Sequence, residues 1–463
     1  VSFYDALAED SSRMIIKGSG KRFGASQKKI EKVIRSINPD VVGIGTMFTA
    51  YFEDSIKLAK IVKNVNKKIV VVFGGSHVSV DPIAVLKESK DVDIAVYGEG
   101  EETLLEICKG KDLNKIDGIA YRNRNKIIKN KARELIKNLD DIPFPAWEVI
   151  DIKKYSLESS FNMRKPVLPM VTSRGCPGHC LYCSVNSVWQ HRWRGRSVEN
   201  ILAEIVLLQK NYGAKEFAFQ DDSLSVDKIR FERLCDEIIK RKLNIKWTTP
   251  NGIAHWTLDK NLIKKMKQAG CYRITFGIES GDCVLRKWVG KPYSLDQAKD
   301  LIKYANNIGM WTLSTNIIGF PYETRKQIEK TLKFSIDSGV DLALFFRLGP
   351  RPGTPIYEIF KKEGWLMKDR HLLFSEDVAC RTKYFLGEEI IKWQKVMYRK
   401  FLVKRWLNLS AIFRVVKKIR DMEDFLYVTK FAKVGLRLGL GLISVNSGVT
   451  SKTLRASDNK KFI

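Results

Sequence analysis

Short runs of consecutive apolar residues alternate with amphipathic segments over the first quarter of the chain. Three runs, at 40–45, 69–75 and 93–97, are too short for helices and predict buried strands. Helical spacing of apolar positions predicts one helix over 28–37 and another around 83–88. It also predicts a helix that ends at Lys63 and a helix that begins at about Glu102. Because strand and helix alternate, the fold class is α/β, and the sheet is expected to be parallel and doubly wound.

The same alternation continues further along the chain with a longer series of elements. Strands are predicted over 166–171, 216–220, 245–249, 273–278, 312–319 and 342–346. Helices are predicted over 198–211, 231–241, 258–269, 295–308 and 325–338. Six strand–helix repeats predict a partial (β/α)6 barrel, whose chemistry lies at the carboxyl ends of its strands.

The segments outside these repeats are less regular. The apolar start at 1–4 predicts a strand, and since the chain begins with Val1 rather than Met, either the start is unusual or the amino terminus is truncated. Alternation at 118–121 and 126–128 predicts a hairpin. We expect five parts: a sheet domain at 1–138, a linker at 139–161, the barrel at 162–357, a helical region at 358–446 and a disordered tail at 447–463.

The helical region near the carboxyl end is basic and rich in aromatic residues. Its most apolar stretch, 425–445, is interrupted by Lys430, Lys433 and Arg437. That combination is typical of a helix lying on anionic lipid. A helix that covers the substrate mouth of the barrel fits equally, and we favour this second interpretation.

Composition adds a strong positive charge to this picture. The chain has 81 Lys and Arg against 52 Asp and Glu, a formal net charge of +29. Such a field favours anionic partners, although a uniformly basic solvated surface would give the same number. No signal-peptide pattern and no run of 18 apolar residues is present, and the eight cysteines form no disulfide framework. We therefore expect a cytoplasmic protein, with membrane association through the basic carboxyl-terminal region as an option.

Three of the cysteines lie close together after the first barrel strand. Cys176, Cys180 and Cys183 form a CxxxCxxC pattern, and such soft ligands suit an iron–sulfur cluster. A cluster of four irons held by three thiolates leaves one iron open to a small molecule. The alternatives are part of a zinc site or free thiols. The other cysteines occur singly, at Cys108, Cys235, Cys271, Cys283 and Cys380.

This spacing, with Tyr182 just before the last cysteine, resembles the signature of the radical S-adenosylmethionine enzymes. The resemblance implies a [4Fe–4S] cluster whose open iron chelates the amino and carboxylate groups of S-adenosylmethionine. Reduction of the cluster then releases a 5′-deoxyadenosyl radical. The resemblance also implies a backbone contact from Tyr182 to adenine.

Residues at the later strand ends extend the resemblance over 166–355. It places Asp221 and Asp222 near the amino group of S-adenosylmethionine, Glu279 at the ribose, and Asn316 with Gly319 at the adenine. Each position also has an ordinary structural role open to it. The two aspartates can cap a helix, Glu279 can form a salt bridge, and Asn316–Gly319 can be a plain strand–helix turn.

The first domain resembles, over 6–113, the Rossmann-like cobalamin-binding domain that precedes many radical S-adenosylmethionine barrels. The resemblance rests on three turns in order, GIGTMFT, GGSHVSVDP and GEGEET. It implies cobalamin contacts from Gly45, Thr46, Thr49, Gly74, Gly75, His77, Gly98, Glu99 and Gly100. The DxHxxG motif that supplies an axial histidine elsewhere is absent, so His77 is expected to cap a helix or touch the cofactor's periphery. A degenerate domain that binds nothing is the alternative.

Together these resemblances imply a cobalamin-dependent radical S-adenosylmethionine enzyme that methylates an unactivated carbon. A cyclase-like ring-forming or oxidative enzyme, a methylthiotransferase acting on RNA, and a non-catalytic cobalamin-binding protein are the alternatives. The methylthiotransferases carry cysteines in their first domain, which here has only Cys108. The expected partners are a small-molecule or lipid substrate, with an anionic one as an option, and an electron donor such as flavodoxin or ferredoxin. No nucleic-acid partner is expected.

Overall fold

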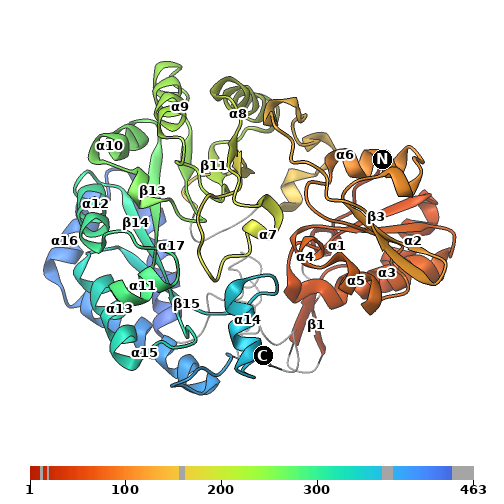
Figure 1. Ribbon diagram of the computed structural model, residues 1–463. Helices are drawn as coiled ribbons and strands as arrows, with labels where there is room; N and C mark the ends of the chain where they lie inside the picture. The colour runs from red at the N-terminus through yellow and green to blue at the C-terminus, as the bar shows by residue number, and fades with distance from the viewer. Residues whose placement is uncertain (11–13, 18–19, 156–161, 368–378, 441–463) are drawn as a thin grey trace, which may run out of the picture.

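The computed structural model describes residues 1–10, 14–17, 20–155, 162–367 and 379–440. Two α/β units lie side by side in Figure 1, the first sheet with its helices on the right and the barrel on the left. The short helix α7, Asn186–Trp189, lies between them. The expected disordered tail at 447–463 lies outside the described residues.

The first unit contains a five-stranded sheet in the order β3-β4-β5-β6-β7. Strands β3 (Val41–Gly45), β4 (Val70–Gly74) and β5 (Ile94–Val96) pair in parallel, as predicted. The hairpin of β6 (Ile119–Asn123) and β7 (Lys126–Lys129) adds to β5 antiparallel, so the sheet is mixed rather than wholly parallel. Strand β3 is at the edge and is only partly buried, which corrects the expectation of a fully buried strand.

All but one of the following helices lie where helical spacing predicted them, and the short helix Ser76–Val80 was not predicted. They are α2 (Gln27–Ile37), α3 (Phe52–Val65), α4 (Ser76–Val80), α5 (Pro82–Glu88) and α6 (Glu101–Cys108). The strand predicted over residues 1–4 is wrong: Val1 and Phe3 are exposed, and no strand within the described part of the chain pairs with them. The short helix α1 (Ala6–Glu9) follows, and then the hairpin of β1 (Met14–Lys17) and β2 (Gly20–Phe23).

The second unit is a six-stranded parallel sheet in the order β15-β14-β13-β12-β11-β8, which curves into the expected partial barrel. The strands are β8 (Val167–Met170), β11 (Glu216–Phe219), β12 (Lys246–Thr248), β13 (Cys271–Glu279), β14 (Trp311–Ile318) and β15 (Leu342–Arg347). The connecting helices are α8 (Val198–Tyr212), α9 (Lys228–Lys240), α10 (Lys260–Gln268), α11 (Cys283–Trp288), α12 (Leu295–Asn307) and α13 (Arg325–Asp337). All neighbouring strands pair in parallel, so their carboxyl ends meet at one edge.

Helix α8 illustrates why the barrel helices form and how they pack. Ser197 caps its first turn and Gly213 ends it with a positive φ. Ile201, Ile205 and Leu208 recur at helical spacing and are completely buried in the barrel core. Burying such a side chain contributes about 1.5–3 kcal/mol. The barrel core is therefore what fixes the strands whose ends carry the candidate site.

The segment expected to be a linker is partly built into the barrel. It contains the 3-10 turns Leu139–Asp141 and Trp147–Val149. Trp147 is buried in the barrel core, where its indole nitrogen donates to Glu204 of α8 at 3.4 Å. This segment therefore attaches the first unit to the barrel by packing as well as by chain connection.

The carboxyl-terminal region consists of α14 (Pro355–Lys362), α15 (Gly387–Trp406), α16 (Leu409–Lys418) and α17 (Met422–Gly439). Helix α17 does not cover the substrate mouth, which corrects our favoured interpretation. Its Tyr427 packs against Tyr272 and Trp311, at the amino ends of β13 and β14. The aromatic contacts hold α17 at the opposite end of the barrel from the cysteine loop.

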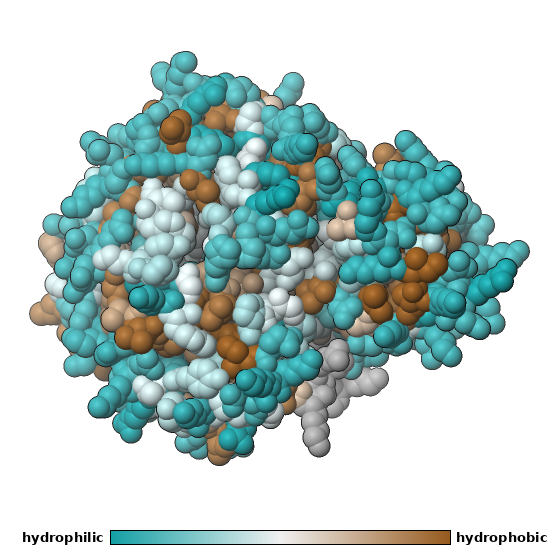
Figure 2. All heavy atoms as spheres, in the orientation of Figure 1, coloured by the Kyte–Doolittle hydropathy of each residue, from teal (hydrophilic) through white to brown (hydrophobic). Residues whose placement is uncertain are grey.

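The surface is mostly hydrophilic in the view of Figure 2, with hydrophobic residues gathered in separate patches. Among the described residues, no helix has the length and apolar character needed to cross a membrane.

Candidate active site

The three cysteines lie in a loop whose two ends are joined by a small antiparallel ribbon. Strand β9 (Ser173–Arg174) pairs with β10 (Arg194–Gly195), so the loop leaves and returns at one place beside the end of β8. Gly175 enters the loop with φ +89°, and a Cβ there would lie 2.0 Å from the carbonyl oxygen of Arg192. Only glycine fits this position without a shift of the backbone.

Two of the cysteine sulfurs lie close to Gly178. A Cβ built on Gly178 would lie 3.3 Å from Cys176 Sγ and 3.8 Å from Cys180 Sγ. Burial raises the pKa of Cys180 to about 11 and, with Cys176, raises the pKa of Cys183, while Lys291 lowers both. Three thiols crowded in a partly buried loop suit a polynuclear cluster, in which each thiolate binds a different iron.

A mononuclear metal site is the alternative use of these cysteines. No three His, Cys, Asp or Glu side chains in the described ranges are arranged around one point as a single ion requires. The zinc interpretation therefore has no geometric support here, whereas a cluster needs ligands spread over its corners.

The two aspartates after β11 have different surroundings. Asp221 is buried, and its carboxylate accepts hydrogen bonds from the backbone and hydroxyl of Thr172 and from the hydroxyl of Ser173. Burial raises the pKa of Asp221, and these donors oppose that rise. Asp222 is exposed and accepts from the backbone of Gly175 at 3.1 Å. Asp221 therefore ties the end of β8 to β11, while Asp222 holds the residue before the first cysteine.

Glu279 ends β13 in a left-handed conformation, with φ +64°. Its carboxylate receives a hydrogen bond from Lys291 at 2.7 Å, and it lies beside Tyr182 of the cysteine loop. Burial alone would lower the pKa of Lys291, but Glu279 and the Cys180 thiol raise it. This arrangement brings the predicted ribose residue and the cysteine loop together. Sequence reasoning missed Lys291, because nothing in its neighbourhood marks a lysine that reaches back across a helix.

Two further buried groups beside this pair were also missed. The guanidinium of Arg286 has two nitrogens without hydrogen-bond partners, and both ring nitrogens of His255 are unpartnered as well. His255 is fully buried and packs edge-on against Trp256 and Tyr293. Orphaned buried polar atoms are costly unless a ligand completes their hydrogen bonds. The surroundings therefore fit a polar cofactor at this strand end.

The neutral state of His255 predicts a dependence of stability on pH. Burial, with help from Arg286 and Lys291, lowers the pKa of His255 from 6.5 to about 3. Because the unfolded chain protonates first as pH falls below 6.5, the native state loses about 2 kcal/mol between pH 7 and pH 5 through this group. We expect the His255→Phe variant to lose correspondingly less folding stability than the wild type between pH 7 and pH 5. Guanidinium unfolding of the cofactor-free protein at both pH values measures the difference, and an equal pH dependence in both proteins would contradict it.

The end of β14 forms the turn that was expected to line the adenine. Gly319 has φ +87°, and its backbone N–H donates to Glu323 at 2.7 Å. Burial raises the pKa of Glu323 to about 8. The side-chain nitrogen of Asn316 donates to Ser314 and Leu344, while its oxygen has no partner. The turn thus has a free buried acceptor and an internally braced backbone, both suited to holding a polar ring.

The carboxyl edge of the first sheet has an open surface. A Cβ on Gly45 or Gly98 would meet nothing within 4 Å, and the hydroxyl of Thr46 is buried without a partner. Large apolar side chains stand exposed beside these residues at Met47, Phe48 and Tyr51. Uncrowded glycines, an orphaned hydroxyl and exposed apolar groups together fit the large, partly apolar ring of cobalamin.

His77 lies on the second turn of this edge, and its surroundings agree with a peripheral role. Its Nδ1 lies 3.0 Å from the hydroxyl of Thr49, and its ring is 4.3 Å from that of Phe52. The neighbouring Gly75 has φ +118° and approaches the carbonyl of Thr46 closely. Gly74 and Gly100 lie in the same group of turns. The three turns are therefore brought together as the resemblance implied.

Glu99 was expected to contact cobalamin, but its carboxylate joins the two units instead. It is buried and forms ion pairs with Arg174 at 2.6 Å and Arg194 at 2.8 Å, the residues that close the cysteine loop. It also accepts a hydrogen bond from the backbone of Ile136. Burial would raise the pKa of Glu99, but the two arginines hold it lower. Glu99 thus fixes the cysteine loop relative to the open sheet edge.

We expect Glu99→Gln to destabilise the protein by about 2–4 kcal/mol, because the partly buried guanidinium of Arg194 would lose its counter-charge, while Arg174 would keep only Glu101. Glu101→Gln is the matched control, since Glu101 is more exposed and pairs only with Arg174. That change should cost less than about 1 kcal/mol. Chemical unfolding of both variants tests this, and equal stabilities would show that Glu99 does not join the units.

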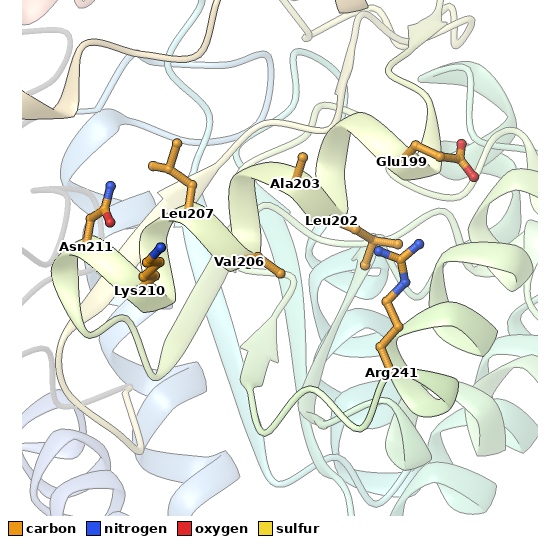
Figure 3. Close-up of a pocket in the computed structure, with 8 residues that line it drawn as sticks. All are labelled: Glu199, Leu202, Ala203, Val206, Leu207, Lys210, Asn211 and Arg241. Carbon is orange, nitrogen blue, oxygen red and sulfur yellow. The ribbon is translucent and has the colours of Figure 1, made fainter.

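A separate hollow lies on the barrel surface along α8 (Figure 3). Its lining residues are Glu199, Leu202, Ala203, Val206, Leu207, Lys210, Asn211 and Arg241. None belongs to the cysteine loop or to a carboxyl strand end. A smaller hollow beside Arg286 and Tyr293 adjoins the strand-end groups described above.

Comparisons with known proteins agree with this geometry. The model of the radical SAM superfamily matches residues 170–335, and that of the B12 binding domain matches residues 21–108. An uncharacterized methyltransferase of Pyrococcus horikoshii is 34% identical over 83% of this chain and 83% of its own length. The cytidylyl-2-hydroxyethylphosphonate methyltransferase of Streptomyces wedmorensis is 29% identical over 87% of this chain and 81% of its own.

Other relatives carry a different activity in their names. The anaerobic magnesium-protoporphyrin IX monomethyl ester cyclase of Rubrivivax gelatinosus is 29% identical over 80% of this chain and 70% of its own. Among solved structures, the cobalamin-dependent S-adenosylmethionine radical enzyme OxsB, with aqua-cobalamin and S-adenosylmethionine bound, has the same fold. Its TM-score is 0.65 at 16% identity, covering 94% of this chain and 68% of that one.

The family matches therefore account for both the radical S-adenosylmethionine cofactors and the cobalamin that the sequence led us to expect. The protein uses a [4Fe–4S] cluster, S-adenosylmethionine and cobalamin, and it is an enzyme with methyltransferases among its relatives. The chain belongs to the cobalamin-binding radical S-adenosylmethionine enzymes, the group that includes the cobalamin-dependent radical methyltransferases and the magnesium-protoporphyrin cyclase-like proteins.

Proposed function

We propose that this enzyme methylates an unactivated carbon of a small molecule. The observation that carries the proposal is the connection of the two units through Glu99, whose carboxylate binds Arg174 and Arg194 at the base of the cysteine loop. When bound, the cluster and S-adenosylmethionine supply a radical that abstracts hydrogen from carbon, and cobalamin supplies a methyl group. Methyl transfer to a substrate radical needs these two sources close together.

The residues of this chain would divide the work as follows. Cys176, Cys180 and Cys183 would hold the cluster, and Asp222 would set the loop by binding the backbone of Gly175. Asp221 would act on the site only through β8, since its oxygens are occupied by Thr172 and Ser173.

The other strand ends would hold S-adenosylmethionine. Glu279 would accept hydrogen bonds from the ribose while Lys291 balances its charge. Asn316 and the backbone around Gly319 would contact the adenine, and Tyr182 would pack beside it. These side chains come from the cysteine loop, β13 and β14, which keeps the cofactor at the protected edge of the barrel.

The open edge of the first sheet would hold cobalamin. Gly45, Thr46, Gly98 and Gly100 would let the backbone approach the ring, and Thr49 with His77 would contact its rim. An acidic electron donor such as flavodoxin or ferredoxin would approach the outer side of the cysteine loop. Arg192 and the stacked rings of His179 and His191 are exposed there.

The proposal is tested without knowledge of the substrate. The reconstituted enzyme is incubated under reducing, anaerobic conditions with S-adenosylmethionine that carries a deuterated methyl group. We expect 5′-deoxyadenosine, S-adenosylhomocysteine and deuterated methylcobalamin by mass spectrometry. Release of 5′-deoxyadenosine with no label on cobalamin would overturn methyl transfer and favour the cyclase-like chemistry of the other relatives.

A further inference from the structure

Helix α16 is amphipathic, but it is oriented with its apolar side outward. Leu409, Ile412, Phe413 and Val416 recur at spacings of three and four residues and therefore form one stripe. All four are exposed, Leu409 to 81% and Phe413 to 59%. A helix packed only for stability would place such a stripe against the core.

The face of α16 that meets the barrel carries a charge instead. Lys418 is only 1% exposed and binds Asp341 at 2.5 Å and Asn306 at 2.6 Å. Arg405 of α15 binds the other oxygen of Asp341 at 2.7 Å. A buried lysine held by a carboxylate fixes the rotation of the helix, so the outward apolar stripe is not an accident of a loosely attached segment.

The surface next to this stripe is strongly basic. Between residues 390 and 420 the chain contains no Asp or Glu. Its exposed cations on α15 are Lys392, Lys395, Arg399, Lys400 and Lys404. These recur at helical spacing and so line one side of α15, which packs against α16. Lys417 of α16 is exposed as well and lies over the ring of Phe413 at 4.6 Å.

The apolar surface continues onto the start of α17, where Met422, Phe425 and Leu426 are exposed. Two of the acidic residues there are paired with arginines, Glu423 with Arg164 and Asp424 with Arg420. The third, Asp421, is exposed and caps α17 by accepting a hydrogen bond from the backbone of Asp424. The combined surface of α15, α16 and the start of α17 therefore has apolar groups bordered by a large excess of positive charge.

We propose that this surface docks onto the face of a bilayer containing anionic lipids. Exposed apolar side chains enter the boundary between headgroups and acyl chains, and the neighbouring cations bind the headgroups. A nucleic acid would satisfy the cations and leave the apolar stripe in water. A second copy of this chain would bring two basic surfaces together. Only a partner that is both anionic and apolar matches both halves of the surface.

The position of this surface separates docking from catalysis. Asn306, Trp311 and Asp341 lie near the amino ends of the barrel strands. Lys418 of α16 donates hydrogen bonds to Asn306 and Asp341 and lies over the ring of Trp311. The cysteine loop lies at the carboxyl ends. Docking through α16 would therefore hold the enzyme at a membrane while its substrate mouth faces the water.

The test uses the full chain, reconstituted with its cofactors, in a sedimentation assay with vesicles. Vesicles of phosphatidylcholine alone are compared with vesicles containing phosphatidylglycerol at low and high salt. The test variant is Leu409→Ser with Phe413→Ser. The matched control is Val149→Ser with Ile229→Ser, two exposed apolar residues outside this surface. Because all four side chains are exposed, neither variant should lose its fold.

We expect the wild type to bind the anionic vesicles and to be released by salt. The test variant should bind about tenfold more weakly or worse, and the control should bind as the wild type does. Cleavage of S-adenosylmethionine without vesicles should be the same in all three. Equal binding of both variants, binding that ignores lipid charge, or no binding by the wild type would overturn the proposal. So would a dimer in solution that only the test variant breaks, since that would assign the stripe to a second copy.

Discussion

Replacing Cys176, Cys180 or Cys183 by alanine is expected to abolish cleavage of S-adenosylmethionine. Each thiolate would hold one corner of the cluster, and a Cβ on Gly178 would lie 3.3 Å from Cys176 Sγ and 3.8 Å from Cys180 Sγ. Loss of one thiolate leaves a second iron without a protein ligand. We expect each variant to retain less than about a tenth of the wild-type iron and to release no 5′-deoxyadenosine.

The control for this experiment is Cys108→Ala. Cys108 is an exposed free thiol at the end of α6, in the other unit of the protein. It should leave both iron content and cleavage unchanged. If a variant at Cys176, Cys180 or Cys183 kept full iron and normal cleavage, the cysteine loop could not be part of the active site.

The second large effect is expected at Asp221, and it is a loss of stability. Replacement by alanine leaves the backbone N–H of Thr172 and the hydroxyls of Thr172 and Ser173 without their acceptor inside the protein. The Arg230 side chain also loses the nearest compensating charge. We expect Asp221→Ala to lower the free energy of unfolding by about 3–5 kcal/mol.

Asp222→Ala separates this structural effect from an effect on the cluster. Asp222 is exposed and accepts hydrogen bonds from the backbone of Gly175 and the side chain of Trp189, so its loss should cost about 1–2 kcal/mol. The cluster loop depends on those bonds, so we expect slower S-adenosylmethionine cleavage with a smaller loss of stability than for Asp221→Ala. Chemical unfolding and 5′-deoxyadenosine release are measured on both variants. Normal stability of Asp221→Ala would contradict the structural role, because buried donors cannot be left unpaired without cost.

Apolar runs and helical spacing were enough to predict the barrel strands, since each run is long enough to cross a buried sheet. Strand β13, for example, covers residues 271–279 and was predicted over residues 273–278. The short ribbon at Ser173–Arg174 and Arg194–Gly195 was not predictable, because two-residue strands carry no periodic signal. The strand expected at 1–4 was wrong because apolar residues alone do not supply a partner strand.

The candidate site divides in the same way. Residues inside local motifs, such as the three cysteines and Glu279, could be proposed from spacing and the family resemblance. Lys291 and His255 were not, since their roles depend on contacts across the barrel end rather than on neighbours in sequence. Glu99 was correctly expected at the carboxyl edge of the first sheet, but its partners Arg174 and Arg194 are 75 and 95 residues away in the sequence. Only the folded structure brings such pairs together.

The most direct test of the central claim is metal analysis after anaerobic reconstitution with iron, sulfide and hydroxocobalamin. The desalted protein should contain about four irons and one cobalt per chain, because in this proposal the cysteine loop would hold the cluster and the open sheet edge would hold cobalamin. Four irons without cobalt would contradict the assignment of the first sheet edge and with it methyl transfer. A protein without iron would contradict the account from the cysteine loop onward.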